Sequence, residues 1–203
     1  MLVEEKANVK QIIINNALEL FSSKGYEGVT VSELVESAGI TKPTLYYYFG
    51  SKEGVFEAVC RLFYDQLNNN LIENAVYIPK IESYSEDIHM TLAKVTNAYF
   101  SFAKKNEAFY KITLTNMSMP SSSSVFVIAR NHHYIQFDII DRMFKDMAKI
   151  HGNLKGKSQI LTWTFIGTIN SYIGLAYNGI FSLELNEKTV KELVHKFMHG
   201  IYA

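Results

Sequence analysis

The sequence predicts an all-α protein of about nine helices, and three observations lead to that prediction. Apolar residues recur at helical spacing almost throughout the 203 residues, and no stretch alternates with the period of two that strands require. Glycine and proline are scarce, at 11 and 3 residues. With 48% hydrophobic residues, the chain is long enough to bury a sizeable core. We expect a domain over residues 1–60 and a second helical domain over residues 61–203.

The first helix is expected over residues 5–24. Its apolar residues, among them Ile13, Ala17 and Phe21, form one stripe at helical spacing. Gly25 follows where a left-handed C-terminal cap belongs. This helix should therefore bury one face.

Two short helices should follow, each with its own start signal. Thr30 begins the first, because Glu33 three residues later completes a capping box. Gly39 interrupts that helix, and Thr41 offers a new N-cap hydroxyl for the next one. Pro43 then falls in the first turn, where its missing N–H costs no hydrogen bond. The pattern predicts two helices that meet across a tight turn.

The remaining helices are separated by clear breaks. Ser51 should cap a fourth helix, whose order weakens toward Pro79. Pro120, Gly152 and residues 183–186 divide the rest of the chain. The helices expected there cover residues 83–105, 106–118, 123–151, 157–182 and 186–202.

Bulk composition excludes some functions and leaves others open. Twenty basic and twenty acidic residues give a net charge of zero, so no global positive field indicates nucleic acid. The single cysteine, Cys60, cannot form an intramolecular disulfide, and no secretory leader pattern opens the chain. We expect a cytoplasmic protein without a cofactor, and common enzyme motifs are missing from the sequence.

Two histidine pairs are candidate metal ligands. His132 and His133 are neighbours, and His195 and His199 share one helix face four residues apart. Neither pair has an identifiable third ligand in the sequence. We therefore expect solvated or interface roles for them and no metal site.

One segment carries a specific resemblance. Residues 30–52, TVSELVESAGITKPTLYYYFGSK, combine the capped short helix, the Ala-Gly-hydrophobic turn, the Thr-Lys opening, Leu-Tyr-Tyr-x-Phe and the Ser-Lys start of the next helix. This segment closely resembles the helix-turn-helix of the TetR family of bacterial transcriptional regulators, and the resemblance covers about residues 5–60. It implies a three-helix DNA-binding domain followed by a domain that binds a small-molecule effector and dimerises. It also implies a non-enzymatic regulator, most often a repressor.

The resemblance implies a recognition helix that begins at Thr41. Leu45 and Phe49 should face the core, and the N-terminal residues of such a helix enter the major groove. We expect Lys42 to reach a guanine edge and Pro43 or Thr44 a thymine methyl. The other candidates would hold phosphates, although Tyr48 packing in the core stays open. The full set of expected DNA contacts is Thr30, Thr41, Lys42, Pro43, Thr44, Tyr46, Tyr47, Tyr48 and Lys52.

The charge of this region departs from what a DNA-binding domain suggests. Through residue 60 there are five lysines and eight glutamates, a net charge of −3. Non-specific affinity depends on neutralised phosphates, so binding to random DNA should be weak and operator binding should need a dimer. An alternative is a helical protein that binds a small molecule or partner and has lost its DNA affinity.

The TetR resemblance implies a homodimer whose last two helices form a four-helix interface. Here those helices are 157–182 and 186–202. Gly167 and Gly174 lie seven residues apart on one face, where another backbone could approach, although packing within one subunit remains open. The last helix has a broad apolar stripe that must pack against something. The stripe residues assigned to the interface are Val190, Leu193, Val194, Phe197 and Met198.

Aromatic and methionine residues are frequent between residues 88 and 177. Some could wall an apolar cavity for the effector, and a packed core explains the same residues equally well. The candidates for the pocket are Tyr99, Phe102, Phe109, Tyr110, Met117, Phe137, Trp163 and Tyr172.

A membrane protein is the third class considered. From Ser158 to Leu183 no acid or base appears apart from tyrosines. Polar residues such as Gln159, Thr162 and Asn170 interrupt this run, and their desolvation in lipid would be costly. We therefore expect a helix buried in protein and no membrane contact.

Overall fold

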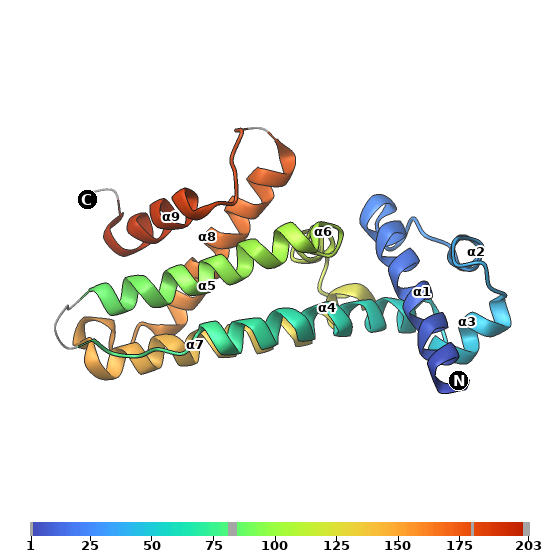
Figure 1. Cartoon of the computed structure of the whole chain (residues 1–203), viewed down its shortest axis with the longest axis horizontal. Coiled ribbons are helices and arrows are strands. Elements are labelled where there is room, and N and C mark those ends of the chain that lie inside the picture. Colours follow the sequence, from blue (N-terminus) through green and yellow to red (C-terminus); the bar gives the residue numbers. More distant parts are fainter. Residues whose placement is uncertain (1, 81–84, 180, 201–203) are drawn as a thin grey trace. The chain divides into compact units, whose positions relative to one another are not determined.

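The computed structural model describes residues 2–80, 85–179 and 181–200. Within these ranges it contains nine α-helices, one short 3-10 helix at Gly152–Leu154 and no strand (Figure 1). The all-α prediction is confirmed. The helices are α1 (Leu2–Lys24), α2 (Val31–Ser37), α3 (Lys42–Phe49), α4 (Lys52–Asn74), α5 (Glu86–Lys105), α6 (Glu107–Asn116), α7 (Ser124–Ile150), α8 (Ser158–Asn178) and α9 (Glu187–His199).

Helix boundaries follow the sequence signals closely, with one clear exception. The helix predicted to reach residue 182 ends at Asn178, because Gly179 adopts a left-handed φ of 63° and caps it there. Three other stretches of the predicted helices lie outside the described residues, namely 83–84, 180 and 201–202.

The chain forms two compact units, and neither is continuous in sequence. The first contains Met1–Asp65 and Asn106–His132, and the second contains Gln66–Lys105 and His133–Ala203. The sequence boundary near residue 60 did not anticipate that α6 would pack against α1 in the first unit. That packing joins a segment after residue 100 to the helix-turn-helix region. Whether residues 1–60 form a separate functional domain stays a prediction.

The core of the first unit is small and aromatic. Leu34 of α2 and Leu45 of α3 are at most 1% exposed, so each short helix buries one leucine. Phe56 of α4 lies edge-on to Phe21 and to Tyr26, with ring centroids 5.5 Å and 5.2 Å apart. Such edge-to-face pairs stabilise beyond their buried area. This cluster fixes α1 against α4.

Gly54, in the first turn of α4, marks a close backbone approach. A Cβ built on this residue would lie 1.9 Å from the carbonyl oxygen of Phe49, the last residue of α3. No side chain fits at that distance. Only glycine lets the end of α3 approach the start of α4 this closely.

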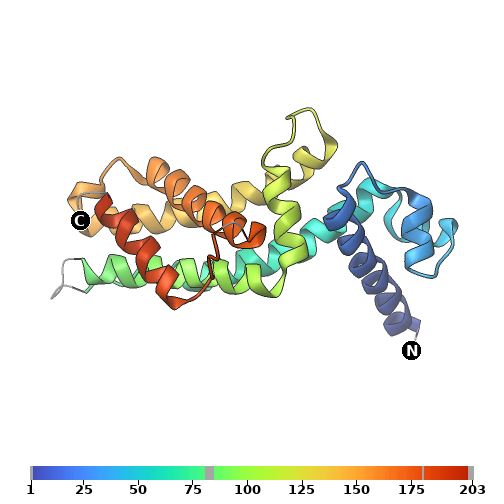
Figure 2. The same ribbon diagram turned by 90° about the horizontal axis from the view of Figure 1, so that it is seen from above.

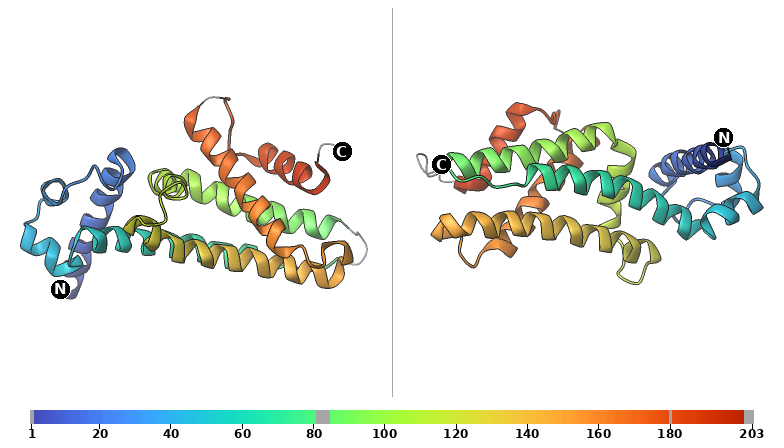
Figure 3. Two further views of the ribbon diagram at one scale, coloured as in Figure 1. Left: turned by 180° about the vertical axis from the view of Figure 1, so that it is seen from behind. Right: turned by 60° about the horizontal axis from the view of Figure 1, so that its bottom comes forward.

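The second unit is a helical bundle in which α5 is central. Helix α5 packs against α9 and α8, and Figures 1 and 2 show α9 beside α5. Figure 3 shows α8 crossing α5 on one face of this bundle. Phe144 of α7, Phe165 of α8 and Phe197 of α9 form one ring cluster, with Phe165 and Phe197 centroids 4.9 Å apart. Three helices are therefore joined through phenylalanines.

A buried polar network adds to this bundle. Asp87, in the first turn of α5, accepts a hydrogen bond from the Tyr77 hydroxyl, and its Oδ2 lies 3.0 Å from His151 Nε2. Asp87 and His151 are 2% and 1% exposed. Burial by itself raises the pKa of Asp87, but the hydrogen bonds from Tyr77, His151 and two backbone N–H groups outweigh it and hold the pKa at about 2. The network ties the start of α5 to the residues that follow α4 and α7.

The uncharged run in α8 was the basis for considering a membrane protein. Among the helices described here, none combines the length and the apolar character that crossing a bilayer requires. Five α8 residues are instead buried in the second unit: Thr162, Phe165, Ile166, Ile169 and Ile173.

Candidate nucleic-acid interface and ligand groove

Local hydrogen bonds fix α2 and α3 at their starts. The Thr30 hydroxyl accepts from the Glu33 N–H at 3.2 Å, and Glu33 Oε2 accepts from the Thr30 N–H at 2.8 Å, which completes the predicted capping box. Thr41 caps α3 through the N–H of Thr44, and Pro43 occupies the first turn. Lys24 also contacts Glu33, with 2.6 Å between Nζ and Oε1. Hydrogen bonds to its carboxylate from Lys24 and from the N–H and hydroxyl of Thr30 hold the pKa of Glu33 at about 2.

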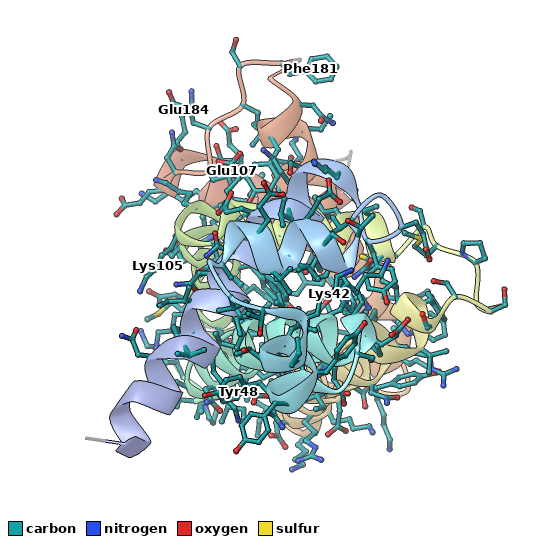
Figure 4. The ribbon with its side chains drawn as sticks, turned by 90° about the vertical axis from the view of Figure 1, so that its right-hand side faces the viewer. Lys42, Tyr48, Lys105, Glu107, Phe181 and Glu184 are labelled. Carbon is teal, nitrogen blue, oxygen red and sulfur yellow. The ribbon has the colours of Figure 1, made fainter. Side chains whose placement is uncertain are left out.

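Helix α3 turns one face inward and offers the rest to solvent. Leu45 is fully buried, as predicted, and Phe49 is half-buried. Lys42 and Pro43 are exposed, and Tyr46 and Tyr47 are 47% and 71% exposed. Figure 4 shows Lys42 and Tyr48 near the two ends of this helix. The first turn of α3 thus presents a lysine and a proline, and the following turn presents two tyrosines.

Two predicted DNA contacts have structural partners. Tyr48 is half-buried and lies beside Tyr47, and Lys10 Nζ of α1 stands 5.8 Å from its ring centroid. Lys52 donates hydrogen bonds to the carbonyl oxygens of Tyr26 and Val29 at 3.1 Å and 3.0 Å. Its ammonium also lies 4.1 Å from the Tyr26 ring centroid. No local sequence pattern predicts these carbonyl contacts, which hold the loop that leads into α2.

A groove of about 750 Å³ opens on the second unit between α7 and α8. The α7 side comes from five residues between positions 134 and 145, and the α8 side comes from the first turns of that helix. Lys145 Nζ contacts Asp141 Oδ2 at 2.6 Å, and the Thr162 side chain is 1% exposed. The lining residues are Tyr134, Phe137, Asp138, Asp141, Lys145, Gly156, Ser158, Gln159, Thr162 and Trp163.

The eight residues predicted to wall an effector pocket are divided between the two compact units. Tyr99 and Phe109 are fully buried, Tyr110 and Phe102 nearly so, and Met117 is 44% exposed. Phe109 stacks on Phe63 in the first unit, whereas the Tyr99 hydroxyl lies 3.5 Å from Gln136 Oε1 in the second. Tyr172 is half-buried on α8. Phe137 and Trp163 both line the α7–α8 groove.

The groove also contains residues that the sequence reasoning missed. Tyr134, Asp138, Asp141 and Lys145 lie on one face of α7, and their spacing was available as a signal. The two carboxylates do not stand out when only aromatic residues and methionines are taken as pocket candidates.

Residues assigned to the dimer interface lie mostly inside the chain. Val190, Leu193 and Val194 are at most 2% exposed in a single chain, because α9 packs on α5. Phe197 joins the phenylalanine cluster, and Met198 is half-buried. The apolar stripe of α9 is therefore explained by packing within one chain. The two predicted interface glycines lie on α8, where Gly167 is exposed and Gly174 is half-buried.

The histidine pairs do not gather further ligands in the part of the chain that the structure describes. No group of three or more histidine, cysteine, aspartate or glutamate side chains is placed there to hold a metal ion. His195 and His199 are exposed on α9 with ring centroids 4.8 Å apart. His132 stacks on Tyr64 in the first unit.

Comparison with known proteins decides which kind of helix-turn-helix this is. Residues 13–59 match the family described as "Bacterial regulatory proteins, tetR family". Over residues 13–59 the chain is therefore similar to the TetR family. A 66-residue stretch is 42% identical to the biofilm operon icaADBC HTH-type negative transcriptional regulator IcaR of Staphylococcus aureus. Over 48 residues the chain is 44% identical to IcaR of Staphylococcus epidermidis.

The likeness to these curated relatives is confined to part of each chain. The matched stretch covers 32% of this chain and 36% of the S. aureus protein, so the chain spans about a third of the length of that relative. The matched family is described as regulatory proteins and these relatives as transcriptional regulators, in agreement with the predicted regulatory role.

Solved structures extend the likeness in fold to nearly the whole chain. FadR of Bacillus subtilis, in complex with stearoyl-CoA, superposes with a TM-score of 0.77 at 19% identity and covers 94% of this chain and 98% of its own. FadR of Bacillus halodurans gives 0.78 at 15% identity, with 95% and 96% covered. The TetR family regulator PfmR of Thermus thermophilus gives 0.67 at 18%, with 93% and 98% covered. At these identities the likeness concerns the fold alone.

Proposed function

We propose that this chain is a TetR-type transcriptional repressor that acts in the cytoplasm. It binds a two-fold symmetric operator as a homodimer and leaves the DNA when a small amphipathic effector binds. The observation that carries the proposal is the outward face of α3, where Lys42, Pro43, Tyr46 and Tyr47 are exposed beside a helix start capped by Thr41. An exposed N-terminal turn of this kind is what a recognition helix inserts into the major groove.

Each exposed residue of α3 has a role in the proposal. Lys42 donates to the O6 and N7 atoms of a guanine, and Pro43 or Thr44 contacts a thymine methyl group. Tyr46 and Tyr47 donate their hydroxyls to phosphate oxygens, with Thr30 and Thr41 near the helix starts.

Two of the proposed DNA contacts are secondary to a structural role. Lys52 has three N–H donors and spends two of them on carbonyl oxygens, so it reaches a phosphate only through the third. Tyr48 is half-buried with Lys10 of α1 beside its ring, so only part of its side chain is open to DNA.

The net charge of −3 on the first 60 residues is a reason to propose a dimer. One such domain neutralises few phosphates, so two domains on one operator are needed for useful affinity. We place the dimer contact on the outward face of α8, where Ile160, Thr164, Gly167 and Ser171 are exposed. A Cβ built on Gly167 meets nothing within 4 Å, which leaves room for a partner backbone.

Release by an effector requires that it bind two dimer geometries with different affinity. Because the groove lies along α8, a ligand there contacts the same helix that the proposed dimer uses. A ligand that shifts α8 would thereby change the separation of the two recognition helices.

The net negative charge also favours a second candidate, a helical sensor whose helix-turn-helix no longer binds DNA. A gel-shift experiment with the promoter DNA next to the encoding gene separates the two. Lys42→Ala should lose roughly 1–3 kcal/mol and relax selectivity at one base pair. Lys191→Ala, which removes an exposed lysine of α9, is the matched control and should leave binding unchanged. If the wild-type chain shifts no DNA from that region, the sensor candidate replaces the repressor.

A further inference from the structure

Three aromatic rings line the α7–α8 groove, and two of them are unusually open to solvent. Tyr134 is 63% exposed and Trp163 is 52% exposed, and Phe137, which also lines the groove, is half-buried. Large exposed aromatic surfaces around a concavity indicate a binding site more often than a plain surface. Their ring faces carry negative charge density, which attracts cations.

Acidic groups stand at the same groove. Asp138 and Asp141 contribute two carboxylates, and Lys145 contributes the single ammonium among the lining residues. Burial raises the pKa of Asp141, but Lys145 and the Ser158 hydroxyl outweigh it, so the pKa is lowered and the group is ionised near neutral pH. The net charge of the lining is therefore −1.

The cations that already contact these carboxylates are exposed and held weakly. Lys145 and Arg142 bind Asp141 and Asp138 four residues away on α7, and their side chains are 63% and 73% exposed. Exposed pairs of this kind contribute little to stability, so a ligand can replace them at small cost. In addition, Asp141 Oδ1 is buried and accepts no well-formed hydrogen bond, although the Ser158 hydroxyl is near enough to lower the pKa of that carboxyl.

A second polar atom in the groove lacks a partner. The Thr162 side chain is 1% exposed, and its hydroxyl oxygen is buried without a hydrogen bond. Leaving such a group unpaired is costly, and a polar atom of a ligand or a bound water would relieve that cost. Thr162 lines the groove on the α8 side.

We propose that the α7–α8 groove binds an amphipathic organic cation, with its charged centre between the two aspartates and its apolar groups against Trp163, Phe137 and Tyr134. This inference deepens the proposed function by naming the class of the effector. Only the role of the cation as effector rests on that function. The binding site itself does not require that the chain bind DNA.

A polyanionic ligand fits this groove poorly. A coenzyme A thioester, the class of ligand seen with B. subtilis FadR, carries several phosphates, and here one lysine would face them together with two carboxylates. The positive end of the α8 helix dipole could favour an anion, but Asp141 already lies beside Ser158 at that end.

The test uses Trp163, which is the only tryptophan in the chain and lines the groove. The full-length protein is titrated with tetraphenylphosphonium, with tetraphenylborate as an anion of the same shape, and with stearoyl-CoA. Tryptophan fluorescence should change saturably with the phosphonium, which should bind about tenfold or more tighter than the borate. Equal or tighter binding of either anion would overturn the proposal.

Charge-neutralising variants locate the site. Asp141→Asn should weaken phosphonium binding by about tenfold, and Asp138→Asn should weaken it by a smaller factor. The control is Asp146→Asn, which removes an exposed α7 carboxylate outside the groove and should leave the affinity unchanged. Circular dichroism checks that each variant is folded, and unchanged affinity in both groove variants refutes the assignment.

The two proposals fail separately. Phosphonium binding that responds to Asp141→Asn supports the groove whether or not the chain shifts DNA. If the chain shifts promoter DNA and saturating phosphonium does not release it, the groove stands and the assignment of the cation as effector is wrong.

Discussion

The helix-turn-helix and the α5–α9 bundle are both helical, yet different physical causes fix them. In the first, hydrogen bonds between residues three apart determine where α2 and α3 begin, as with Thr30 and Glu33. In the second, the position of α9 depends on α5, about 100 residues earlier in the chain. Capping is a local property of sequence, whereas the surface that covers an apolar stripe is not. The helix starts of the helix-turn-helix are therefore predictable from the sequence, whereas the packing of the α5–α9 bundle is not.

The largest effect should come from the part of the bundle that was expected to lie in an interface. Leu193→Ala should destabilise the chain by about 2–5 kcal/mol, because Leu193 is 1% exposed within a single chain. Denaturant unfolding followed over a wide range of protein concentrations measures this loss. We expect the same loss at every concentration.

An interface role for Leu193 would give another result. The loss would then grow with protein concentration, because only the dimer would be weakened. Leu45→Ala, with Leu45 fully buried in the first unit, serves as the matched control for a core leucine in α3.

A smaller effect is expected from the polar network of the bundle. Asp87→Asn should cost about 1–3 kcal/mol at neutral pH, because the Tyr77 hydroxyl and His151 lose a charged acceptor. The folded-state pKa of Asp87, about 2, lies below its ordinary value of 3.8. The stabilisation is therefore present above pH 3.8 and is lost as the pH falls through 2.

Unfolding at a series of pH values tests this linkage. The difference in the free energy of unfolding between wild type and Asp87→Asn should narrow below pH 4 and nearly vanish near pH 2. This range is set by the pKa values of Asp87 in the unfolded and folded states, 3.8 and about 2. A difference that stays constant down to pH 2 would show that the carboxylate charge is not the cause.

The smallest effect is expected at the local cap. Thr30→Ala should cost about 1 kcal/mol, because it removes the hydroxyl that accepts from the Glu33 N–H. Ser32→Ala, two residues later on the exposed side of α2, is the control and should be nearly neutral. Thermal unfolding measures both, and equal losses would contradict a capping role.

Glu33, the acidic partner of Thr30 in this cap, should make the stability of the chain depend on pH. The folded-state pKa of Glu33, about 2, is depressed from 4.5 by Lys24 and Thr30. Its stabilisation is thus present above pH 4.5 and is lost as the pH falls through 2. Glu33→Gln should destabilise the chain at neutral pH and have little effect near pH 2, and unfolding midpoints at the two pH values check this.

The sequence predicts the helix-turn-helix well and the packing of the α5–α9 bundle poorly. Thr41, Pro43 and Leu45 specified α3 through their caps and spacing, and the structure has them as predicted. The covering of Leu193 by α5 depends on a contact that no local pattern encodes. The chain direction after Asn178 was missed because an Asn-Gly pair in an apolar run was read as helix, although Gly179 ends it.

The candidate sites divide in the same way. Lys42, Tyr46 and Tyr47 needed only helical geometry to be placed on the outside of α3. Phe137 and Trp163 were named among eight aromatic and methionine residues, but nothing in the sequence placed these two side by side. Lys52 was expected to bind phosphate because it stands at a helix start, and the carbonyl oxygens it contacts lie more than twenty residues earlier.

The glycine at position 54 bears on how movement reaches the α3 surface. A Cβ at position 54 would lie only 1.9 Å from the Phe49 carbonyl oxygen. The end of α3 and the start of α4 are therefore in direct main-chain contact, with no side chain between them that could change its rotamer. Interfaces of this kind lack the slack that rotamer changes provide. A small rotation of the first turns of α4 should therefore move α3 by a similar amount.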